Sequence, residues 1–197
     1  MNFITFEGPE GAGKSTVLGR VAEALRADGH LVLATREPGS GEFGARIREL
    51  LLHGADMCAE AELFLFLADR AEHMASTVAP ALARGDWVLC DRHIDSTLVY
   101  QSIGRGLPSD FVQSANALAT KGIAPRRTIL FDIEPSLGLA RIQHKDRMDA
   151  QPIEFHQRIR QGFLDLANLH PDRMRIIDAS QDLEKVTKDA LRAILEP

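Results

Sequence analysis

The sequence predicts a three-layer α/β fold in which a five-stranded parallel sheet is flanked by helices. Short apolar runs of strand type alternate with longer helical patterns along the whole chain. One run, residues 87–91, is apolar at four successive positions, which suits a strand covered on both faces. Because parallel strands need a long crossover, usually a helix, such alternation is typical of a parallel sheet between two helical layers.

The expected strands share a simple pattern. Each is a short, mostly apolar run that ends at a polar residue or a turn. They lie at residues 2–6, 31–35, 87–91, 128–132 and 174–178. The sheet should therefore bury both faces.

The expected helices follow an apolar spacing of three and four residues. In the first, Leu18, Val21 and Leu25 share one face, and Gly29 is placed to end it. Pro80 should bend the third helix. The predicted helices span residues 14–28, 42–53, 59–84, 94–102, 109–121, 136–143, 154–169 and 181–195.

Composition narrows the class of protein. The chain has 197 residues and a net charge of −5, so a long nucleic-acid site, which normally needs a basic excess, is disfavoured. The two cysteines, Cys58 and Cys90, lie in apolar sequence and do not make a disulfide framework. We expect one domain, residues 1–197, in the cytoplasm, with neither nucleic acid nor a membrane as partner.

The strongest motif joins the first strand to the first helix. Residues 8–15 fit the pattern G-x-x-x-x-G-K-[ST] and are followed by a threonine. Glycines let such a loop turn its backbone N–H groups toward phosphate, and the helix N-terminus adds a positive dipole. The predicted ATP-binding residues are Gly8, Pro9, Glu10, Gly11, Ala12, Gly13, Lys14, Ser15 and Thr16.

A phosphate loop of this kind usually works with Mg²⁺. Lys14 is predicted to reach the β- and γ-phosphates, and the Ser15 hydroxyl to bind the metal. Asp91 ends a strand and is followed by Arg92, so it is the preferred acidic partner. Asp132 and Asp178 also end strands, but we interpret them as cap or loop residues.

Several single cations follow strands or lie in loops. Arg36 and Arg92 follow strands, where α/β sheets bind ligands. A charge-rich connection, residues 141–152, adds Arg141, Lys145 and Arg147. This scatter on an acidic chain fits a small phosphorylated acceptor, because phosphoryl transfer depends on positioning and on neutralising charge. The guanine-reading motif N-K-x-D is absent, which excludes a GTPase switch.

From residue 3 to about residue 195, the chain resembles the bacterial thymidylate kinases, a family of P-loop nucleoside-monophosphate kinases. The resemblance rests on separated motifs. They are Phe-Glu-Gly-Pro-Glu-Gly-Ala-Gly-Lys-Ser-Thr at 6–16, Thr-Arg-Glu-Pro-Gly at 35–39, Phe-Leu-Ala-Asp-Arg-Ala-Glu-His at 66–73, Asp-Arg-His at 91–93, Ser-Thr-Leu-Val-Tyr-Gln at 96–101, Gly-Arg-Gly at 104–106 and Asp-Arg-Met-Asp at 146–149, before Phe155.

The resemblance implies transfer of the γ-phosphoryl group of MgATP to dTMP, and it implies a homodimer. It also implies that Arg36 and Arg92 hold the dTMP phosphate, with Arg92 also stabilising the transferring group. Phe66 would stack on thymine. The other implied acceptor residues are Glu10 at the 3′-hydroxyl, Tyr100 near the 2′ position, Arg70, Thr97 and Gln101 at the polar edge of the base, and Pro38 and Arg48 in the pocket wall.

The connection at 141–152 departs from the family pattern. Members whose phosphate loop lacks an internal arginine supply a catalytic arginine from a lid, and here that lid is short. Met148-Asp149 stands where Ile-Glu is usual, and Ser40 where a second glycine is common. The catalytic cation is therefore left open between Arg141, Lys145 and Arg147.

Two other functions remain as alternatives at this point. One is a P-loop kinase for another small acceptor, either a different monophosphate or a deoxynucleoside. The other is a nucleotide-binding module that kept the loop but lost an effective lid, for which the short connection is the one supporting feature.

Overall fold

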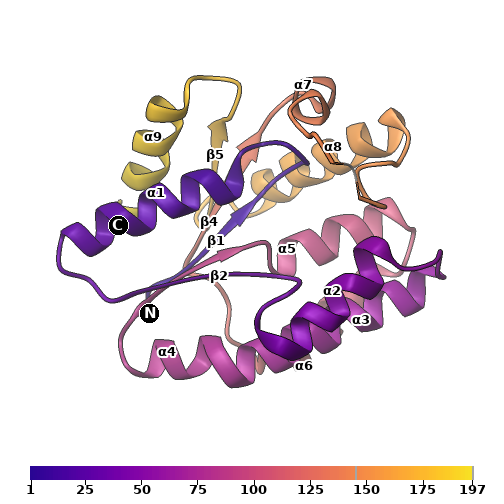
Figure 1. Ribbon diagram of the computed structural model, residues 1–197, viewed down its shortest axis with the longest axis horizontal. Helices are drawn as coiled ribbons and strands as arrows, with labels where there is room; N and C mark the ends of the chain where they lie inside the picture. The colour runs from indigo at the N-terminus through magenta and orange to yellow at the C-terminus, as the bar shows by residue number, and fades with distance from the viewer. Residues whose placement is uncertain (145, 197) are drawn as a thin grey trace.

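A five-stranded parallel sheet forms the centre of the protein, as predicted (Figure 1). The computed structural model describes residues 1–144 and 146–196. The strand order is β2-β3-β1-β4-β5, and every neighbouring pair is parallel. The strands are β1 (Phe3–Glu7), β2 (Val32–Arg36), β3 (Trp87–Asp91), β4 (Arg127–Asp132) and β5 (Met174–Asp178). Each lies within one residue of its predicted position.

Helical segments connect the strands and cover both faces of the sheet. They are α1 (Lys14–Ala27), α2 (Gly41–His53), α3 (Ala59–His73), the π-helical η1 (Met74–Val78), α4 (Ala79–Ala83), α5 (Ile94–Thr97), the π-helical η2 (Leu98–Gly104), α6 (Ser109–Thr120), α7 (Pro135–Ala140), α8 (Ile153–Leu169) and α9 (Leu183–Leu195). Within the described residues, every helix is too short or too polar to cross a lipid bilayer.

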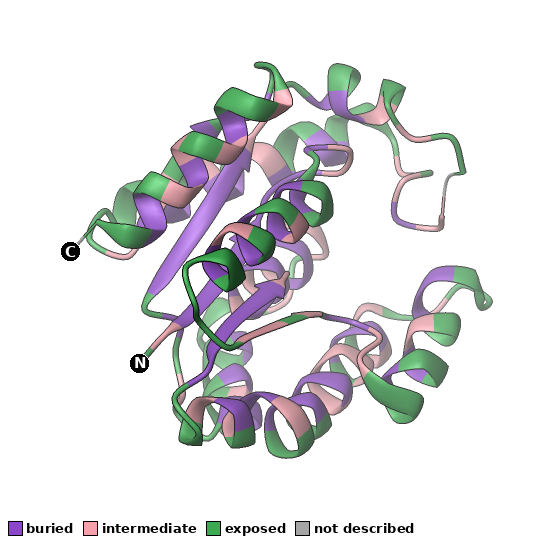
Figure 2. Ribbon diagram, turned by 60° about the vertical axis from the view of Figure 1, so that its left-hand side comes forward, coloured by how far each residue is buried: buried purple, intermediate pink, exposed green. Residues whose placement is uncertain are grey.

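Alternating side chains of the sheet pack against two separate helical layers. On one face, Ile4 and Phe6 pack with the apolar stripes of α1 and α9. On the other face, Phe3 and Val88 pack with η1 and α4, while Leu130 packs with α8 and η2. The central strands β1, β3 and β4 are accordingly buried between green-and-purple amphipathic helices, whereas the edge strands β2 and β5 are partly exposed (Figure 2). This is the three-layer arrangement that the sequence predicts.

Two predicted helices contain π-helical segments instead of continuing as α-helix. Residues 59–84 form α3, η1 and α4 in succession. Pro80 has no N–H to donate to residue 76, and the N–H of Ala79 bonds to Met74, five residues back. Residues 94–102 likewise become α5 and η2, and η2 extends to Gly104. π segments are frequent at functional sites, and η2 carries two predicted binding residues.

Smaller differences concern cysteines and helix ends. Cys58 is exposed, which corrects the apolar setting expected from its sequence neighbours, whereas Cys90 is buried in β3. Pro108 caps α6, and Ser109 is its first residue. Residues 141–143, predicted to continue a helix, follow the end of α7.

Strand register places two predicted site residues, Asp91 and Arg36, at one edge of the sheet. Asp91 at the end of β3 pairs with Phe6 of β1 on one side and with Arg36 of β2 on the other. The loop that follows β1, residues 8–13, therefore starts beside Asp91. Ligands of α/β proteins bind at this carboxyl edge.

Candidate active site

The loop between β1 and α1 is as tight as its glycines predict. A Cβ on Gly8 would lie 2.4 Å from the carbonyl oxygen of Phe131, and one on Gly11 would lie 1.9 Å from that of Gly138. Both glycines also have positive φ angles, as does Gly13, the N-cap of α1. No other residue fits at Gly8 or Gly11 without moving backbone, so the loop depends on glycine for its shape.

Lys14 lies across this loop. Its Nζ donates to the carbonyl oxygens of Gly8, at 3.0 Å, and Pro9, at 2.7 Å. Burial, reinforced by the nearby Arg92, lowers the pKa of Lys14 to about 8. The amine is therefore held beside the loop and poorly solvated, a state that favours an incoming phosphate as partner.

Ser15 and Asp91 are in direct contact. The Ser15 hydroxyl donates to Asp91 Oδ2, which joins the start of α1 to the end of β3. A hydroxyl and a carboxylate oxygen thus converge at the mouth of the loop. Oxygen donors of this kind suit Mg²⁺, which prefers hard ligands and keeps several waters, so these two residues fit the predicted metal site.

Arg92 occupies a constrained position directly after β3. Its φ angle is 68°, in the left-handed region. The guanidinium binds the Glu10 carboxylate, donates to Ser96 Oγ at 3.0 Å and lies 5.2 Å from the centre of the Tyr100 ring. Burial, the largest single effect, would lower the pKa of Arg92, but Glu10, Tyr100 and the other acidic groups nearby together outweigh it and raise that pKa. Arg92 therefore keeps its charge at the centre of the site.

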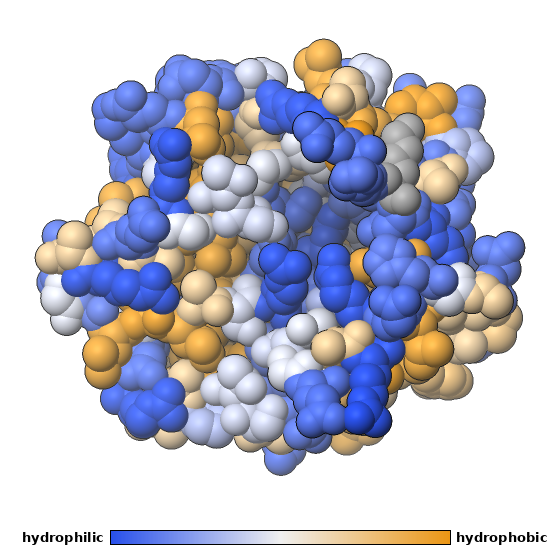
Figure 3. Space-filling model, viewed as in Figure 1, coloured by the Kyte–Doolittle hydropathy of each residue, from blue (hydrophilic) through white to orange (hydrophobic). Residues whose placement is uncertain are grey.

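A cavity of about 360 Å³ lies between the phosphate loop and α2, α3 and η2. Figure 3 shows a hydrophilic hollow near the middle of this face. All the side chains predicted to bind the acceptor line this cavity: Glu10, Arg36, Pro38, Arg48, Phe66, Arg70, Arg92, Thr97, Tyr100 and Gln101. Gly11, Lys14, Ser15 and Asp91 line it as well. Residues from five separate motifs thus meet in one place.

Arg70 is held by a buried network at the inner end of the cavity. Its Nε donates to Glu37 Oε2 at 2.8 Å, and its Nη1 donates to Thr97 Oγ1 at 2.8 Å and Asn116 Oδ1 at 2.6 Å. Only 2% of Arg70 is exposed. Burial would raise the pKa of Glu37, but Arg70 and two histidines outweigh it and hold that pKa well below its usual range.

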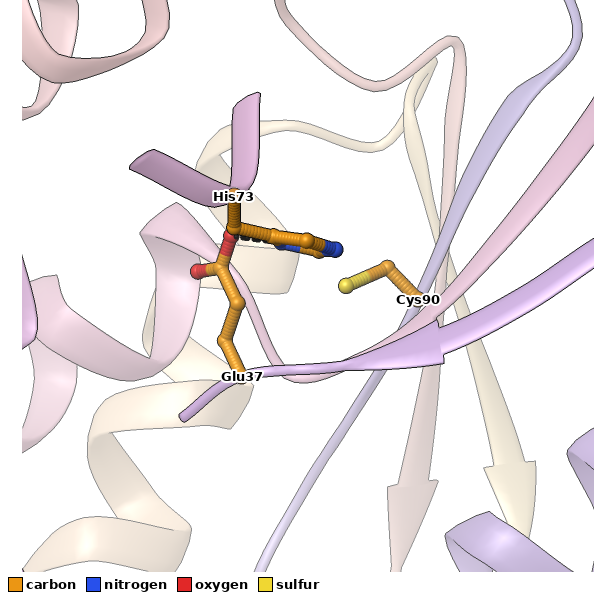
Figure 4. A group of neighbouring side chains, drawn as sticks. All are labelled: Glu37, His73 and Cys90. Atoms are coloured by element: carbon orange, nitrogen blue, oxygen red, sulfur yellow. Dashed lines mark hydrogen bonds and ion pairs between the residues drawn. The ribbon is translucent and has the colours of Figure 1, made fainter. Parts of the chain in front are cut away.

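Behind Arg70, three groups that could in principle bind a metal lie close together (Figure 4). The ligand atoms of Glu37, His73 and Cys90 lie within 4.8 Å of one another. His73 is already engaged, with Nδ1 2.8 Å from Glu37 and Nε2 2.8 Å from Thr35 Oγ1. Burial raises the pKa of the Cys90 thiol well above its usual value, so the sulfur stays protonated. His73 therefore helps to fix Glu37, whereas the Cys90 thiol donates to the carbonyl oxygen of Arg92.

A second buried carboxylate, Glu62 of α3, accepts hydrogen bonds from three side chains. Gln101 Nε2 donates to Oε1 at 2.9 Å, and Arg105 donates to both oxygens at 3.1 Å. Arg147 Nη2 donates to Oε2 at 2.7 Å. Burial would raise the pKa of Glu62, but these hydrogen bonds outweigh it and lower that pKa, so the carboxylate is ionised.

Comparison with known proteins identifies the family. A family model described as thymidylate kinase matches residues 6–190. The chain belongs to the thymidylate kinase family. It is 45% identical to a protein named thymidylate kinase from Nitratidesulfovibrio vulgaris, over 98% of this chain and 95% of that protein. A namesake from Bacillus pumilus is also 45% identical, over 98% and 94% of the two chains.

Solved structures agree with this assignment. The crystal structure of thymidylate kinase from Ehrlichia chaffeensis superimposes with a TM-score of 0.83 at 31% identity, covering 98% of each chain. The predicted P-loop fold and the predicted class, a nucleoside-monophosphate kinase, are thereby confirmed.

The thymidylate kinase resemblance left the catalytic cation open, and the structure separates two of the three candidates. Arg141 is exposed at the end of α7, and its Nη1 lies 3.2 Å from the carbonyl oxygen of Ala179 and 3.5 Å from that of Gly11 in the phosphate loop. Arg147 instead donates to Leu51 and Glu62 near the other end of the cavity. Lys145 lies outside the described residues.

Other predicted residues of the thymidylate kinase site lie around the cavity rather than in its lining. Gly8, Pro9, Ala12 and Gly13 form the loop itself, and Thr16 is exposed on the first turn of α1. Asp132 and Asp178 bind Arg160 and Ser180 respectively, away from this cavity. They act as the structural residues that the sequence analysis favoured.

Sequence reasoning missed the carboxylates that position this family's binding residues. Glu37 and Ser96 lie inside family motifs but received no role, and Glu62 and Asn116 were not singled out. A signal for Glu62 exists, since it is a charged residue next to Leu63 in the buried stripe of α3. Three residues of the 146–149 motif, Asp146, Met148 and Asp149, also line the cavity but had received no role.

Proposed function

We propose that this chain transfers the γ-phosphoryl group of ATP to dTMP in the cavity beside the phosphate loop, giving dTDP and ADP. Membership of the thymidylate kinase family supports the reaction. The observation that carries the residue assignment is the convergence of every predicted acceptor-binding side chain on one cavity that also opens onto Lys14 and Ser15.

In this proposal the thymine ring lies at the inner end of the cavity, against Phe66. An aromatic face suits a pyrimidine ring. Nε and Nη1 of Arg70 are engaged with Glu37, Thr97 and Asn116, which leaves Nη2 to donate to a carbonyl oxygen of the base. Gln101 lies on the same wall and contacts the polar edge of the base.

The sugar and phosphate of dTMP are assigned to the outer part of the cavity. Tyr100 Oη donates to Glu10 Oε1 at 2.8 Å, so the ring and the carboxylate form one surface against the deoxyribose. Arg92 meets the phosphate at the centre. Arg36 is exposed at the end of β2 and takes part in no ion pair with the described residues, so its charge is available to the same phosphate.

On the donor side, we assign the ATP phosphates to the loop and to Lys14. Mg²⁺, when bound by Ser15 and Asp91, would neutralise phosphate charge and orient the γ-phosphoryl group. The acceptor oxygen of dTMP is already anionic, so the reaction needs no general base. Arg92 lies between the two nucleotides and is assigned the charge that develops during transfer.

The connection at 141–152 is proposed to act as a lid over the nucleotides. Arg141 Nη1 lies 3.5 Å from the carbonyl oxygen of Gly11 in the phosphate loop, and we assign Arg141 to the donor phosphates. Covering the reacting groups would exclude water, which would otherwise hydrolyse ATP.

We also propose that the chain acts as a cytoplasmic homodimer. Large apolar side chains are about half exposed or more on adjacent helices, namely Phe43 and Leu50 of α2, Phe64 of α3 and Phe111 and Leu118 of α6. These helices lie together on one side of the molecule (Figure 1). Light scattering should give twice the mass of one chain, and a monomer would contradict this part of the proposal.

The activity is tested by measuring ADP release with a panel of nucleoside monophosphates. We expect dTMP to give the highest kcat/KM, with dUMP weaker and the purine monophosphates near background. ATP and dTMP binding without dTDP formation would instead favour a non-catalytic nucleotide-binding module. A different preferred acceptor would overturn the assignment of the base pocket.

A further inference from the structure

The orientation of the Gln101 amide is set by Glu62. The two side chains meet at 2.9 Å, and both are 1% exposed. An ionised carboxylate only accepts hydrogen bonds, so the amide must turn its NH₂ group toward Glu62. The opposite orientation would bring two acceptor oxygens together in a buried site, which is costly.

This orientation decides what Gln101 offers to a ligand. With Nε2 committed to Glu62, the amide presents its carbonyl oxygen, Oε1, on the other side. Gln101 lines the cavity, and Oε1 has no hydrogen-bond partner among residues 1–144 and 146–196. The wall of the cavity therefore carries an acceptor at this point.

Glu62 is itself fixed from two further directions. Arg105 donates to both of its oxygens and is stacked 5.2 Å from the centre of the Phe155 ring, while Arg147 adds a third ionic contact. Each carboxylate oxygen thus receives at least two donors. A carboxylate held in this way has little freedom to rotate, so it fixes the orientation of the Gln101 amide.

We propose that Glu62 is a specificity-determining positioning residue, which forces Gln101 to present an acceptor and so selects bases that carry an N–H at ring position 3. The inference rests on the proposed function, in which Gln101 contacts the polar edge of the base. Thymine and uracil have a donor at N3 beside a carbonyl at C4. Cytosine has an acceptor at N3 and an amino donor at C4.

Arg70 completes the discrimination. Its Nη2 is a donor, so the pair of Arg70 and Gln101 offers a donor next to an acceptor. This pattern matches the C4 carbonyl and N3–H of thymine, and it opposes both groups of cytosine. A cytosine in the same position would leave buried polar groups unpaired, and such mismatches discriminate strongly.

The test is the preference for dTMP over dCMP in Glu62→Gln, measured as the ratio of dissociation constants by calorimetry and of kcat/KM. A glutamine at position 62 is nearly isosteric but can donate as well as accept, so it tolerates either orientation of Gln101. We expect the ratio to fall about tenfold or more, which corresponds to about 1.4 kcal/mol. The ratio of dTMP to dUMP should stay within about twofold, because both bases carry N3–H.

A control substitution, and a swap variant in which residues 62 and 101 are exchanged, make this test more specific. Glu60→Gln alters an exposed carboxylate on the same helix and should leave both ratios unchanged. In the double variant Glu62→Gln with Gln101→Glu, the glutamine donates to the new carboxylate, which again presents an acceptor to the base. The swap should therefore recover the preference for dTMP over dCMP. If Glu62→Gln alone does not fold, the swap variant carries the test.

The outcomes separate this inference from the proposed function. A wild-type chain that does not prefer dTMP over dCMP would overturn the assignment of the base pocket. A wild type that prefers dTMP, together with a folded Glu62→Gln variant that weakens dTMP and dCMP equally, would show that Glu62 has a structural role only and would overturn the inference. Loss of the preference in a folded swap variant would overturn it as well.

Discussion

The two ends of the cavity are built differently. At the inner end, Glu37, Glu62, Arg70 and Gln101 are all at most 4% exposed and hydrogen-bond to one another or to neighbouring helices. At the end beside the phosphate loop, Ser15, Arg36 and Arg141 are exposed, and the groups available to a phosphate are backbone N–H groups and single cations.

This difference suggests separate roles: the inner end recognises the base, and the end beside the phosphate loop carries out the transfer. Buried, mutually oriented donors and acceptors give the base a preorganised site, so binding should require little rearrangement there. The exposed cations beside the loop have no such support, and ATP, Mg²⁺ and dTMP must order them on binding. We therefore expect substitutions at the inner end to change stability and acceptor choice, and substitutions at the loop end to change turnover.

Arg92→Ala should have the largest effect, because Arg92 lies between the two ends and is assigned the charge of the transferring group. We expect kcat to fall about a thousandfold, with ATP affinity changed little. Steady-state kinetics and ATP titration measure both quantities. Arg20→Ala, at an exposed arginine of α1, is the control. Wild-type turnover in Arg92→Ala would refute the assignment.

Glu37→Gln should destabilise the protein more than any exposed change. It removes the charge that balances Arg70 in a buried pair, at a cost of about 3 kcal/mol in the free energy of unfolding. Urea denaturation measures this loss. The exposed pair of Glu42 and Arg46 provides the control, since Glu42→Gln should cost less than about 0.5 kcal/mol. Equal effects of the two substitutions would contradict the preorganised inner end.

Replacing either Arg141 or Arg147 of the lid with alanine should affect opposite ends of the cavity. Arg141→Ala should raise KM for ATP and lower kcat by about tenfold, because Arg141 lies beside Gly11. Arg147→Ala should raise KM for dTMP instead, because Arg147 binds Glu62. Steady-state kinetics with each substrate varied would separate the two. Identical kinetic changes in both variants would show that the ends are not distinct.

A smaller effect concerns Glu7, at the end of β1. Burial raises the pKa of Glu7 to about 8, so the folded protein holds a proton that the unfolded chain releases near pH 4.5. The contribution of Glu7 to stability is therefore full at low pH and is lost as the pH rises from about 4.5 to about 8. Glu7→Gln should remove this dependence, measured as the free energy of unfolding between pH 5 and 8. An unchanged pH profile would contradict the assignment.

Most of the fold could be predicted from the sequence, because it is encoded locally. The strands are continuous apolar runs, and the glycines of the loop between β1 and α1 predicted a turn that the structure shows to be sterically obligatory at Gly8 and Gly11. The π segments could not be predicted in the same way. In η1 the N–H of Ala79 bonds to Met74, five residues back, directly before Pro80, and an apolar period does not reveal this.

The sequence predicts the residues that line the candidate site better than the residues that hold them in place. The residues that face the cavity carry motif signals, and the predicted set converges there. Two of the residues that orient them, Glu62 and Asn116, carry no such signal, because their partners Arg105 and Arg70 lie on segments distant in sequence. A charged residue in a buried stripe indicates that a partner exists but does not identify it.

The central claim is that dTMP lies with its base at Arg70 and Gln101 and its phosphate at Arg36 and Arg92. The most direct measurement is a crystal structure of the chain with dTMP and a non-hydrolysable ATP analogue. We expect Arg70 Nη2 at the C4 carbonyl oxygen, Gln101 Oε1 at N3 and both phosphate groups within reach of Arg92. A base bound elsewhere, or an acceptor phosphate remote from Arg92 and the loop, would contradict the claim.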